Sequence, residues 1–487
     1  MSVAYTQRKR WRNHNGNQAV EPLRVYKPAT LGELREIVAT AASDGVTVRA
    51  VGSGHSWSDV ALTEGYLVET HRLARPLEVD CLRAGWDEPV ERVEAGMRLR
   101  DLNQVLAGKG RALLQMGGYD AQTVAGVIST STHGSGISLG ALPDFVRSFD
   151  LVAGDASVHR IERVAGPTDP DVFAAEHPDW ELSQDDDVFD AAVVGMGSMG
   201  IVYAATLAVT GAYWLTEVRE LTTWSRVRPQ LAAALAGNRH YEVYINPYAG
   251  SDGEHRCIVC RRNPADPRKR RSLDRLRRHW WIELLSRLKI TGLVGLIIDR
   301  VNPDGAPGRI DQMLGILADN EYSGPSYKVL NIGAANLLPA YSAEIAVPMA
   351  GDRHLEAVDR LIAVADRHRR LGRAYHTGLI SLRFVKASSA YMSMMHGGDA
   401  MTIELILMNQ TEGGLELLSA HEDALYAVGG RPHWGQVNTL CDEVVHELYP
   451  RYDRWLAVRE RFDPGGMFDA PFTKRVGISD GARAAAR

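Results

Sequence analysis

The chain has 487 residues, of which 45% are hydrophobic and 24% are charged, and its formal net charge is −5. This length is enough for two or three domains with substantial cores, and the composition is that of an ordinary globular protein. The charge gives no reason to expect nucleic acid as a partner, and four cysteines are too few for a disulfide scaffold.

The cysteines and the N-terminal residues bear on metal binding and location. Cys257 and Cys260 form a lone Cys-x-x-Cys pattern in HRCIVCRRN, which we predict to be a strand, and no second Cys or His pair stands at metal-ligand spacing. We therefore expect neither a metal site nor a redox pair. Residues 1–17 are basic without the apolar stretch of a signal peptide, and no segment has the length of a membrane span, so we expect a cytoplasmic protein.

Helices and strands alternate in the first part of the chain, which is an α+β pattern. Residues 30–43 are predicted to form a helix, because Thr30 and Glu33 have capping-box spacing and apolar side chains share one face. A strand over residues 91–96 and a helix over residues 99–106 follow, the helix stopping before the next glycines.

A strand that runs into a glycine turn, VRAVGSGHSWSD over residues 48–59, is the first candidate site. Gly52 and Gly54 permit positive φ and leave no Cβ in the way of a ligand, so backbone N–H groups can converge on a phosphate beside His55. The alternative is a strand-ending turn that carries a surface histidine.

A second stretch, MGGYDAQTVAGVISTSTHGSG over residues 116–136, is dense in Gly, Ser and Thr and has no amphipathic period. Its apolar residues Val124, Val127 and Ile128 indicate that it is packed inside the protein. Buried backbone and hydroxyl groups need partners, and a nucleotide cofactor would supply them.

A third stretch places Gly195, Gly197 and Gly200 in Gly-x-Gly-x-x-Gly spacing after a predicted apolar strand. A Rossmann fingerprint requires a helix to begin at the last glycine. Residues 201–209, IVYAATLAV, are instead rich in β-branched and aromatic residues, so we predict a strand and reject the Rossmann fold.

Together these stretches resemble the vanillyl-alcohol oxidase superfamily, with its FAD-binding domain of PCMH type, and within it the sugar-lactone and alditol oxidases. Five motifs occur in family order over nearly the whole chain, which makes the resemblance much stronger than any one of them. The motifs are VGSGHSWSD, DAQTVAGVISTSTHGSG, GMGSMGIVYAATL, RPHWGQ (431–436) and RFDPGGMFDAPF (461–472).

The resemblance implies FAD as the cofactor. In the family the first glycine turn binds the FAD pyrophosphate and its histidine is commonly bonded covalently to the flavin 8α-methyl, a role that falls on His55. Some members lack this histidine and bind FAD noncovalently. The residues expected to bind the cofactor are Gly52, Ser53, Gly54, His55, Ser56, Gly117, Thr123, Gly126, Ser129, Thr132, His133, Gly134, Ile201 and His433.

The resemblance also implies the domain organisation. An FAD-binding domain of two α/β subdomains would cover residues 18–211, a cap residues 212–430, and a segment that returns to the FAD-binding domain residues 431–476. The family cap contains an antiparallel sheet flanked by helices. The sequence agrees, with predicted strands at 327–337, 341–349, 379–388 and 401–408 and an amphipathic helix over 352–371.

A basic segment in the predicted cap, residues 267–301, combines seven arginines and lysines near its start with Trp280, Trp281 and an apolar tail. One interpretation is an interfacial helix that contacts anionic lipid. We favour the other, a solvated helix pair whose apolar side is core or oligomer interface, because basic amphipathic patterns have several common causes. The oligomeric state is left open.

For the chemistry, oxidation of an alcohol on flavin needs a group that accepts the hydroxyl proton and positive charge near the reduced flavin. In sugar oxidases a cap strand carries Glu-x-Arg and a motif of HWGK type supplies a lysine. The corresponding residues here are Ser381 and Arg383, and His433 with Gln436, so the arginine is kept and the glutamate and lysine are not. This departure leaves open a substrate other than an aldonolactone or alditol, with a less polar alcohol.

Acidic residues of neighbouring strands could compensate for the missing glutamate. Glu404 is a candidate base if its strand face points to the flavin, and a solvent-facing residue otherwise. For Glu344 we expect a structural role. The catalytic residues predicted are thus Arg383, Glu404, Gln436 and His433.

We predict an FAD-dependent oxidoreductase that moves a hydride from a CH–OH centre of a sugar lactone, polyol or related alcohol to flavin N5, with O₂ as acceptor. One alternative is a dehydrogenase that uses another acceptor on a bulkier, less polar alcohol. A second alternative is a flavin-binding protein without turnover, against which the retention of His55, Arg383 and His433 argues.

Overall fold

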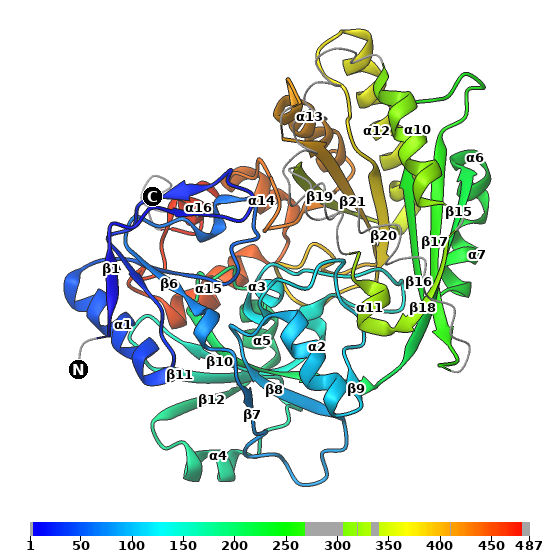
Figure 1. The fold of residues 1–487 in the computed structure, drawn as a ribbon. Coiled ribbons are helices and arrows are strands. Elements are labelled where there is room, and N and C mark those ends of the chain that lie inside the picture. Colours follow the sequence, from blue (N-terminus) through cyan, green and yellow to red (C-terminus); the bar gives the residue numbers. More distant parts are fainter. Residues whose placement is uncertain (1–2, 268–304, 319, 333–339, 410, 480–487) are drawn as a thin grey trace.

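The computed structural model describes residues 3–267, 305–318, 320–332, 340–409 and 411–479. Two bodies of sheet and helix face one another (Figure 1), one built from both ends of the chain and the other from its middle. The basic segment at 268–301 lies outside the described residues. Among the helices that are described, none combines the length and apolarity needed to cross a bilayer.

The first sheet is small and carries the first glycine turn. Its strand order is β1-β4-β6-β5, and β6 is parallel to both β4 and β5. The strands are β1 (Tyr5–Gln7), β4 (Arg24–Tyr26), β6 (Tyr66–Glu69) and β5 (Val48–Val51). A short ribbon of β2 (Trp11–Arg12) and β3 (Ala19–Val20) stands apart from this sheet.

Helix α1 (Leu31–Asp44) covers this sheet and follows the predicted capping pattern. Thr30 Oγ1 accepts a hydrogen bond from the Glu33 N–H at 3.2 Å, and the Glu33 carboxylate accepts one from the Ala29 N–H at 2.7 Å. Gly45 ends the helix in the left-handed region, with φ of 65°. The helix predicted over residues 30–43 is confirmed.

The second sheet has the order β12-β11-β10-β13-β8-β7 and contributes the second and third glycine stretches. Its strands are β7 (Pro76–Leu77), β8 (Val90–Glu94), β10 (Val146–Val152), β11 (Val158–Glu162), β12 (Trp180–Gln184) and β13 (Ile201–Ala208). The accompanying helices are α2 (Leu99–Gly108), α3 (Val124–Ser129), α4 (Pro170–Glu176) and α5 (Asp186–Ala192). Strands β9 (Arg111–Ala112) and β14 (Thr210–Gly211) form a separate short antiparallel pair.

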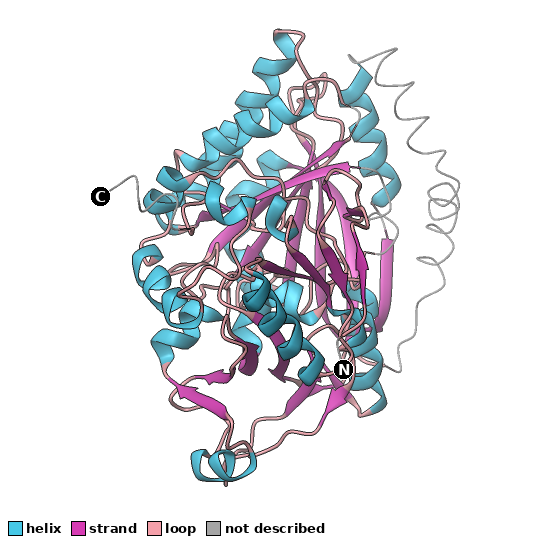
Figure 2. Cartoon of the chain, turned by 90° about the vertical axis from the view of Figure 1, so that its left-hand side faces the viewer, coloured by secondary structure: helices cyan, strands magenta, loops and turns pink. Residues whose placement is uncertain are grey.

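The middle of the chain forms an antiparallel eight-stranded sheet in the order β18-β15-β17-β16-β20-β21-β19-β22. Figure 2 shows it flanked by helices, as predicted for the cap. The strands are β15 (Trp214–Thr223), β16 (His240–Ile245), β17 (Arg256–Ala265), β18 (Asn320–Pro325), β19 (Ala340–Pro348), β20 (Ile380–Val385), β21 (Ala400–Met408) and β22 (Arg431–Pro432). The helices are α6 (Trp224–Val227), α7 (Leu231–Gly237), α10 (Ala306–Leu317), α11 (Ser326–Leu330), α12 (Arg353–Arg370) and α13 (Gly414–Tyr426).

The two faces of this sheet differ because side chains alternate along each strand. On β21, Ile403, Leu405 and Leu407 are fully buried in a core shared with α7, α12 and α13. Glu404 and Ile406 point to the other face, which looks toward the first half of the molecule. One face is therefore the apolar core of the cap, and the opposite face is free to carry polar side chains.

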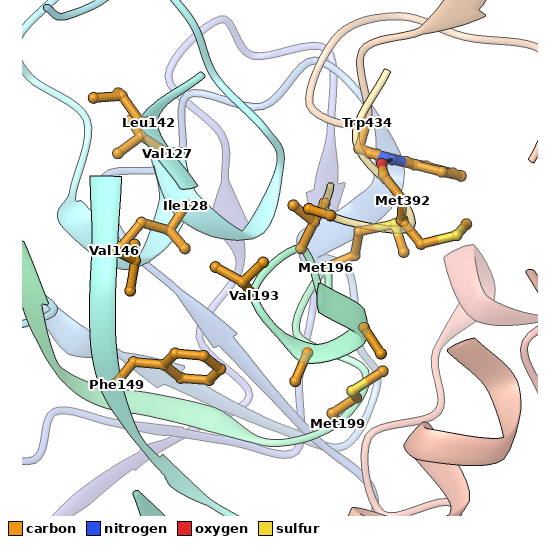
Figure 3. Packing of buried hydrophobic residues seen from close by; sticks show 14 of the residues in the cluster. Val127, Ile128, Leu142, Val146, Phe149, Val193, Met196, Met199, Met392 and Trp434 are labelled. Atoms are coloured by element: carbon orange, nitrogen blue, oxygen red, sulfur yellow. Dashed lines mark hydrogen bonds between the residues drawn. The ribbon is translucent and has the colours of Figure 1, made fainter. Parts of the chain in front are cut away.

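The C-terminal helices α14 (Asp442–Leu448), α15 (Tyr452–Phe462) and α16 (Pro471–Arg475) pack on the first half of the chain (Figure 1). Trp455 and Phe472 belong to the same hydrophobic core as α3 and α5. Figure 3 shows part of this core, in which Val193 and Met196 lie between Val127 and Ile128 of α3 on one side and Trp434 on the other.

A buried arginine connects these segments through hydrogen bonds. Arg49, on β5 and 1% exposed, donates to the backbone oxygens of Val60, Met196, Gly197 and Phe468 at 2.7–3.1 Å. It thereby joins the first glycine turn, the third glycine stretch and the C-terminal segment. Buried carbonyl groups need such partners.

Four predicted elements differ from the structure. The second glycine stretch contains the short helix α3, and α2 continues through Gly108. The apolar residues before Gly195 lie at the end of α5 and in the turn that follows it, and not in a strand, because Asp185 caps a helix there. Within the strand predicted at 327–337, residues 326–330 form α11, and residues 333–337 lie outside the described part of the chain.

Candidate active site

A cavity of about 530 Å³ lies between the glycine stretches of the first half and the polar face of the eight-stranded sheet. Its wall contains every predicted site residue except Gly134. These are Gly52, Ser53, Gly54, His55, Ser56, Gly117, Thr123, Gly126, Ser129, Thr132, His133, Ile201, Arg383, Glu404, His433 and Gln436. The fold thus brings four of the five motifs to one place, and the fifth, at 461–472, does not line the cavity.

Gly134 is the exception, because it serves packing between loops. A Cβ at this position would lie 2.5 Å from Gln115 Oε1 and 2.6 Å from the Met116 carbonyl oxygen. Gly134 therefore lets two segments of the second glycine stretch approach closely, and it does not face the cavity.

The first glycine turn has no room for side chains at its glycines. A Cβ on Gly52 would lie 2.1 Å from Thr123 Oγ1, and Gly54 has a φ of 67°. Thr123 itself caps α3, accepting from the Gly126 N–H at 3.3 Å. The first and second stretches therefore form one continuous surface.

His55 lies in this surface between two other rings. Its centroid is 4.3 Å from that of His14 and 4.8 Å from that of Tyr119. Burial, together with the neighbouring His14, lowers the pKa of His55 to about 3. The ring is therefore neutral at pH 7 and keeps a free lone pair, which a nucleophile requires.

The N-terminal segment forms part of the wall, which the sequence analysis missed. Trp11 and His14 line the cavity, the His14 N–H donates to the Gly54 oxygen at 2.7 Å, and Asn13 Nδ2 donates to the Ser56 oxygen at 2.8 Å. The polar composition of residues 13–18 marks a turn, but it does not say what the turn packs against. Tyr119, Arg219 and Tyr244 are further residues of the wall that were missed.

The motif around His433 is hydrogen-bonded to the first glycine turn. The Trp57 N–H donates to the Gly435 oxygen at 2.7 Å, and Ser58 Oγ donates to the Trp434 oxygen at 2.6 Å. His433 Nδ1 accepts from the Gly435 N–H at 3.0 Å, so the proton of the neutral ring is on Nε2. Burial lowers the pKa of His433 to about 4, so the ring is uncharged at pH 7.

Charged side chains follow one another across the polar face of the eight-stranded sheet. Arg219 pairs with Glu217 at 3.0 Å, Glu217 with Arg262 at 2.6 Å, and Arg262 with Glu242 at 2.8 Å. All four are at most 8% exposed. Burial opposes ionisation of Glu242, but Arg262 and Arg383 lower its pKa to about 2.

Arg383 continues the series on β20. It lies 3.8 Å from Glu242, 3.4 Å from Glu344 and 2.9 Å from Glu404, and its side chain is 11% exposed. We call the whole series the charge row; its members are Arg219, Glu217, Arg262, Glu242, Arg383, Glu404 and Glu344. Burial alone would lower the pKa of Arg383, but the neighbouring carboxylates keep it raised.

Glu404 is the carboxylate closest to Arg383, and it also lines the cavity. The alternative in which it faces solvent is wrong, since its side chain is only 15% exposed. Strand register places it directly opposite Ser381, so a carboxylate stands beside the position from which the family glutamate is missing. Burial raises the pKa of Glu404 against the opposing charge of Arg383. Glu344, to which we had assigned a structural role, lies in the wall as well.

The wall fits the cofactor that the motifs imply. Ser53 Oγ and Gln436 Oε1 are buried and have no hydrogen-bond partner within the described residues, so they have capacity for a polar ligand. The glycines of the first turn leave its backbone accessible, as a bound pyrophosphate requires.

Comparisons with known proteins agree with this site. A family model for the FAD binding domain matches residues 22–162, and one for D-arabinono-1,4-lactone oxidase matches residues 205–476. The chain is 28% identical to L-gulono-1,4-lactone dehydrogenase of Mycobacterium tuberculosis, over 96% of this chain and 98% of that one. It is 25% identical to L-gulonolactone oxidase of Mus musculus, over 93% and 95%.

The fold also matches a solved structure, that of a solvent-stable cholesterol oxidase, with a TM-score of 0.77, 15% identity and 98% coverage of both chains. Fold and site therefore define an FAD-dependent oxidoreductase that acts on CH–OH groups, and the predicted superfamily and fold class are confirmed. Within this class, the chain belongs to the D-arabinono-1,4-lactone oxidase family.

Proposed function

We propose that this protein oxidises a CH–OH group of a sugar lactone, a polyol or a related alcohol, and that Glu404 accepts the hydroxyl proton. The observation that carries the proposal is the pairing of Glu404 with Arg383 at 2.9 Å in the wall of the cavity that the glycine stretches also line. When bound, FAD supplies the two-electron acceptor.

Arg383, Glu242 and Glu344 support Glu404 in its proposed role as the base. Arg383 directs the carboxylate of Glu404 and offers donors to the substrate oxygen. Because burial raises the pKa of Glu404, its ionised form is a stronger base than an exposed carboxylate. Once Glu404 has taken up the proton, the carboxylates of Glu242 and Glu344 still lie 3.8 and 3.4 Å from Arg383.

The substrate class rests on the relatives, whose names refer to gulono- and arabinonolactones. The same names include both oxidases and a dehydrogenase. We propose O₂ as the acceptor. A second candidate is a dehydrogenase that acts on a less polar alcohol with another acceptor, which the apolar side chains Met313, Leu317, Ile406 and Met408 of the cavity wall favour.

We further propose that FAD is attached covalently through His55. The neutral ring and its place in the wall support this proposal. Acid precipitation tests it: the yellow colour should stay with the wild-type pellet and leave the pellet of His55→Ala. Release of the colour from the wild type would show that FAD is bound noncovalently.

Anaerobic mixing of the holoenzyme with a panel of lactones, polyols and apolar alcohols tests the main proposal. Bleaching of the flavin absorbance by at least one compound is expected, and readmission of air should produce peroxide. Bleaching without peroxide, followed by reduction of a dye, would establish the dehydrogenase. A flavin that no compound in the panel bleaches would refute turnover on CH–OH groups.

A further inference from the structure

The imidazole ring of His133 lies between two oxygen atoms in the wall of the cavity. Its Nδ1 lies 2.8 Å from the Gly134 carbonyl oxygen, and its Nε2 lies 3.3 Å from Glu344 Oε1. The side chains of His133 and Glu344 are almost completely buried, at 1% and 5% exposure. A carbonyl oxygen can only accept a hydrogen bond, so Nδ1 must carry a proton.

The second nitrogen then decides the charge of the ring. A neutral imidazole has one N–H, which is already used at Gly134, so Nε2 would turn a lone pair toward the carboxylate. Only a doubly protonated ring can donate to both oxygens. A protonated Glu344 could also satisfy the contact, but the guanidinium of Arg383, 3.4 Å away, favours the ionised carboxylate.

The charge row supports the same protonation state. Its seven named members are three cations and four carboxylates, so these members taken together carry one negative charge in excess. Uncompensated buried charge is costly. A protonated His133, in contact with the last carboxylate of the row, restores the balance.

The position of this cation matters because the other histidines of the cavity wall, and the residue at the position of the family lysine, carry no charge. Gln436 stands where the family has a lysine, and burial lowers the pKa values of His433, His55 and His14. Of the cavity-lining side chains that the structure describes in residues 11–202, His133 is thus the one that its contacts hold as a cation. It sits in the second glycine stretch, on the side where the cofactor motifs meet.

We propose that His133, kept as an imidazolium by Glu344, is the fixed positive charge that stabilises the negative charge which the bound flavin takes up on reduction. It supplies the positive charge that a lysine supplies in the family, at whose position this chain has Gln436. The inference rests on the proposed function for its flavin, but the protonation state of the ring does not depend on any substrate. Preorganised charge of this kind is effective in a dry site.

The protonation state can be measured directly by NMR of protein labelled with ¹⁵N-histidine, with His133 assigned by its loss in His133→Gln. Both ring nitrogens of His133 should show N–H shifts in the wild type at pH 7. Glu91→Gln is the matched control, because Glu91 is a buried glutamate that pairs with Lys109 and Arg111 and lies in neither the charge row nor the cavity wall. The ring should stay doubly protonated in this control and become neutral in Glu344→Gln.

The effect on the flavin can be measured with sulfite, which binds oxidised flavin more tightly the more positive the surroundings. His133→Gln and Glu344→Gln should each weaken sulfite binding at least tenfold and make the midpoint potential more negative. Adding Gln436→Lys to His133→Gln should restore much of the affinity, because it returns a cation to the site.

Two results would overturn the proposal. One is a neutral His133 in the wild type, and the other is an unchanged affinity for sulfite in both His133→Gln and Glu344→Gln. Neither measurement uses a substrate. A protein that passes both tests but is not bleached by any alcohol or lactone would refute the proposed function and leave the role of His133 standing.

Discussion

Replacing Glu404 by Gln removes the proposed base with little change of shape. The amide oxygen can still accept from Arg383, whose guanidinium also keeps Glu344 at 3.4 Å and Glu242 at 3.8 Å. We therefore expect a loss of stability of only about 1–3 kcal/mol, as for one weakened buried hydrogen bond. A positioned general base contributes about 10²–10⁴-fold to the rate, so kcat for flavin reduction should fall by that factor.

Stopped-flow measurement of flavin reduction under anaerobic conditions is the assay for this variant. In the wild type the rate should rise with pH through the pKa of Glu404, since only the ionised carboxylate accepts a proton. Burial raises that pKa, so the rise should lie above pH 4.5. Glu404→Gln should lose this pH dependence as well as the rate.

Thr402→Val provides the control. Thr402 lies on the same face of β21 two residues away, its hydroxyl has no partner among the described residues, and it does not line the cavity. This change should leave flavin reduction within about twofold, as for a substitution that removes no interaction. A Glu404→Gln enzyme that reduces its flavin as fast as the wild type would refute the assignment of Glu404 as the base.

Three further outcomes follow from the contacts described above. Gly52→Ala should prevent incorporation of FAD, measured as flavin absorbance of the purified protein, because its Cβ would lie 2.1 Å from Thr123 Oγ1; a full flavin content would contradict the role of this turn. Arg49→Met should lower the free energy of unfolding by about 3–5 kcal/mol in denaturant titration, because it leaves buried carbonyl groups without partners, and a loss below 1 kcal/mol would show that they find other donors. Burial raises the pKa of Glu422 to about 7, so this group stabilises the fold below its unfolded pKa and loses that contribution as pH rises toward 7. Glu422→Gln should therefore be more stable than the wild type at pH 8 by roughly 3 kcal/mol and equal to it near pH 4, and parallel stability curves would contradict this assignment.

The local elements of the fold could be predicted where a local cause determines them. The helix after Thr30 follows from its cap, and the alternation of residues 401–408 follows from a sheet with one apolar face. Helix α3 was missed because six residues with glycine and serine show no amphipathic period. Helix α11 was missed because five residues with Tyr and Val resemble a strand in composition.

The site could be predicted as a set of motifs but not as a charge arrangement. The glycine stretches and the segment around His433 are recognisable one by one, and the fold brings them together. The charge row depends on strand register, which pairs residues distant in sequence. Ser381 and Glu404 are directly opposite one another on β20 and β21, and nothing in either strand alone indicates this.

Residues 11–14 and 433–436, which are far apart in the sequence, both line the cavity, so the order of synthesis determines when its wall is complete. Residues 11–14 cover the first glycine turn, and residues 433–436 are hydrogen-bonded to its far side. Because the ribosome delivers the chain from its N-terminus, the first half emerges long before the segment that completes the wall. The wall that residues 433–436 help to form is therefore complete only after residue 436 has left the ribosome.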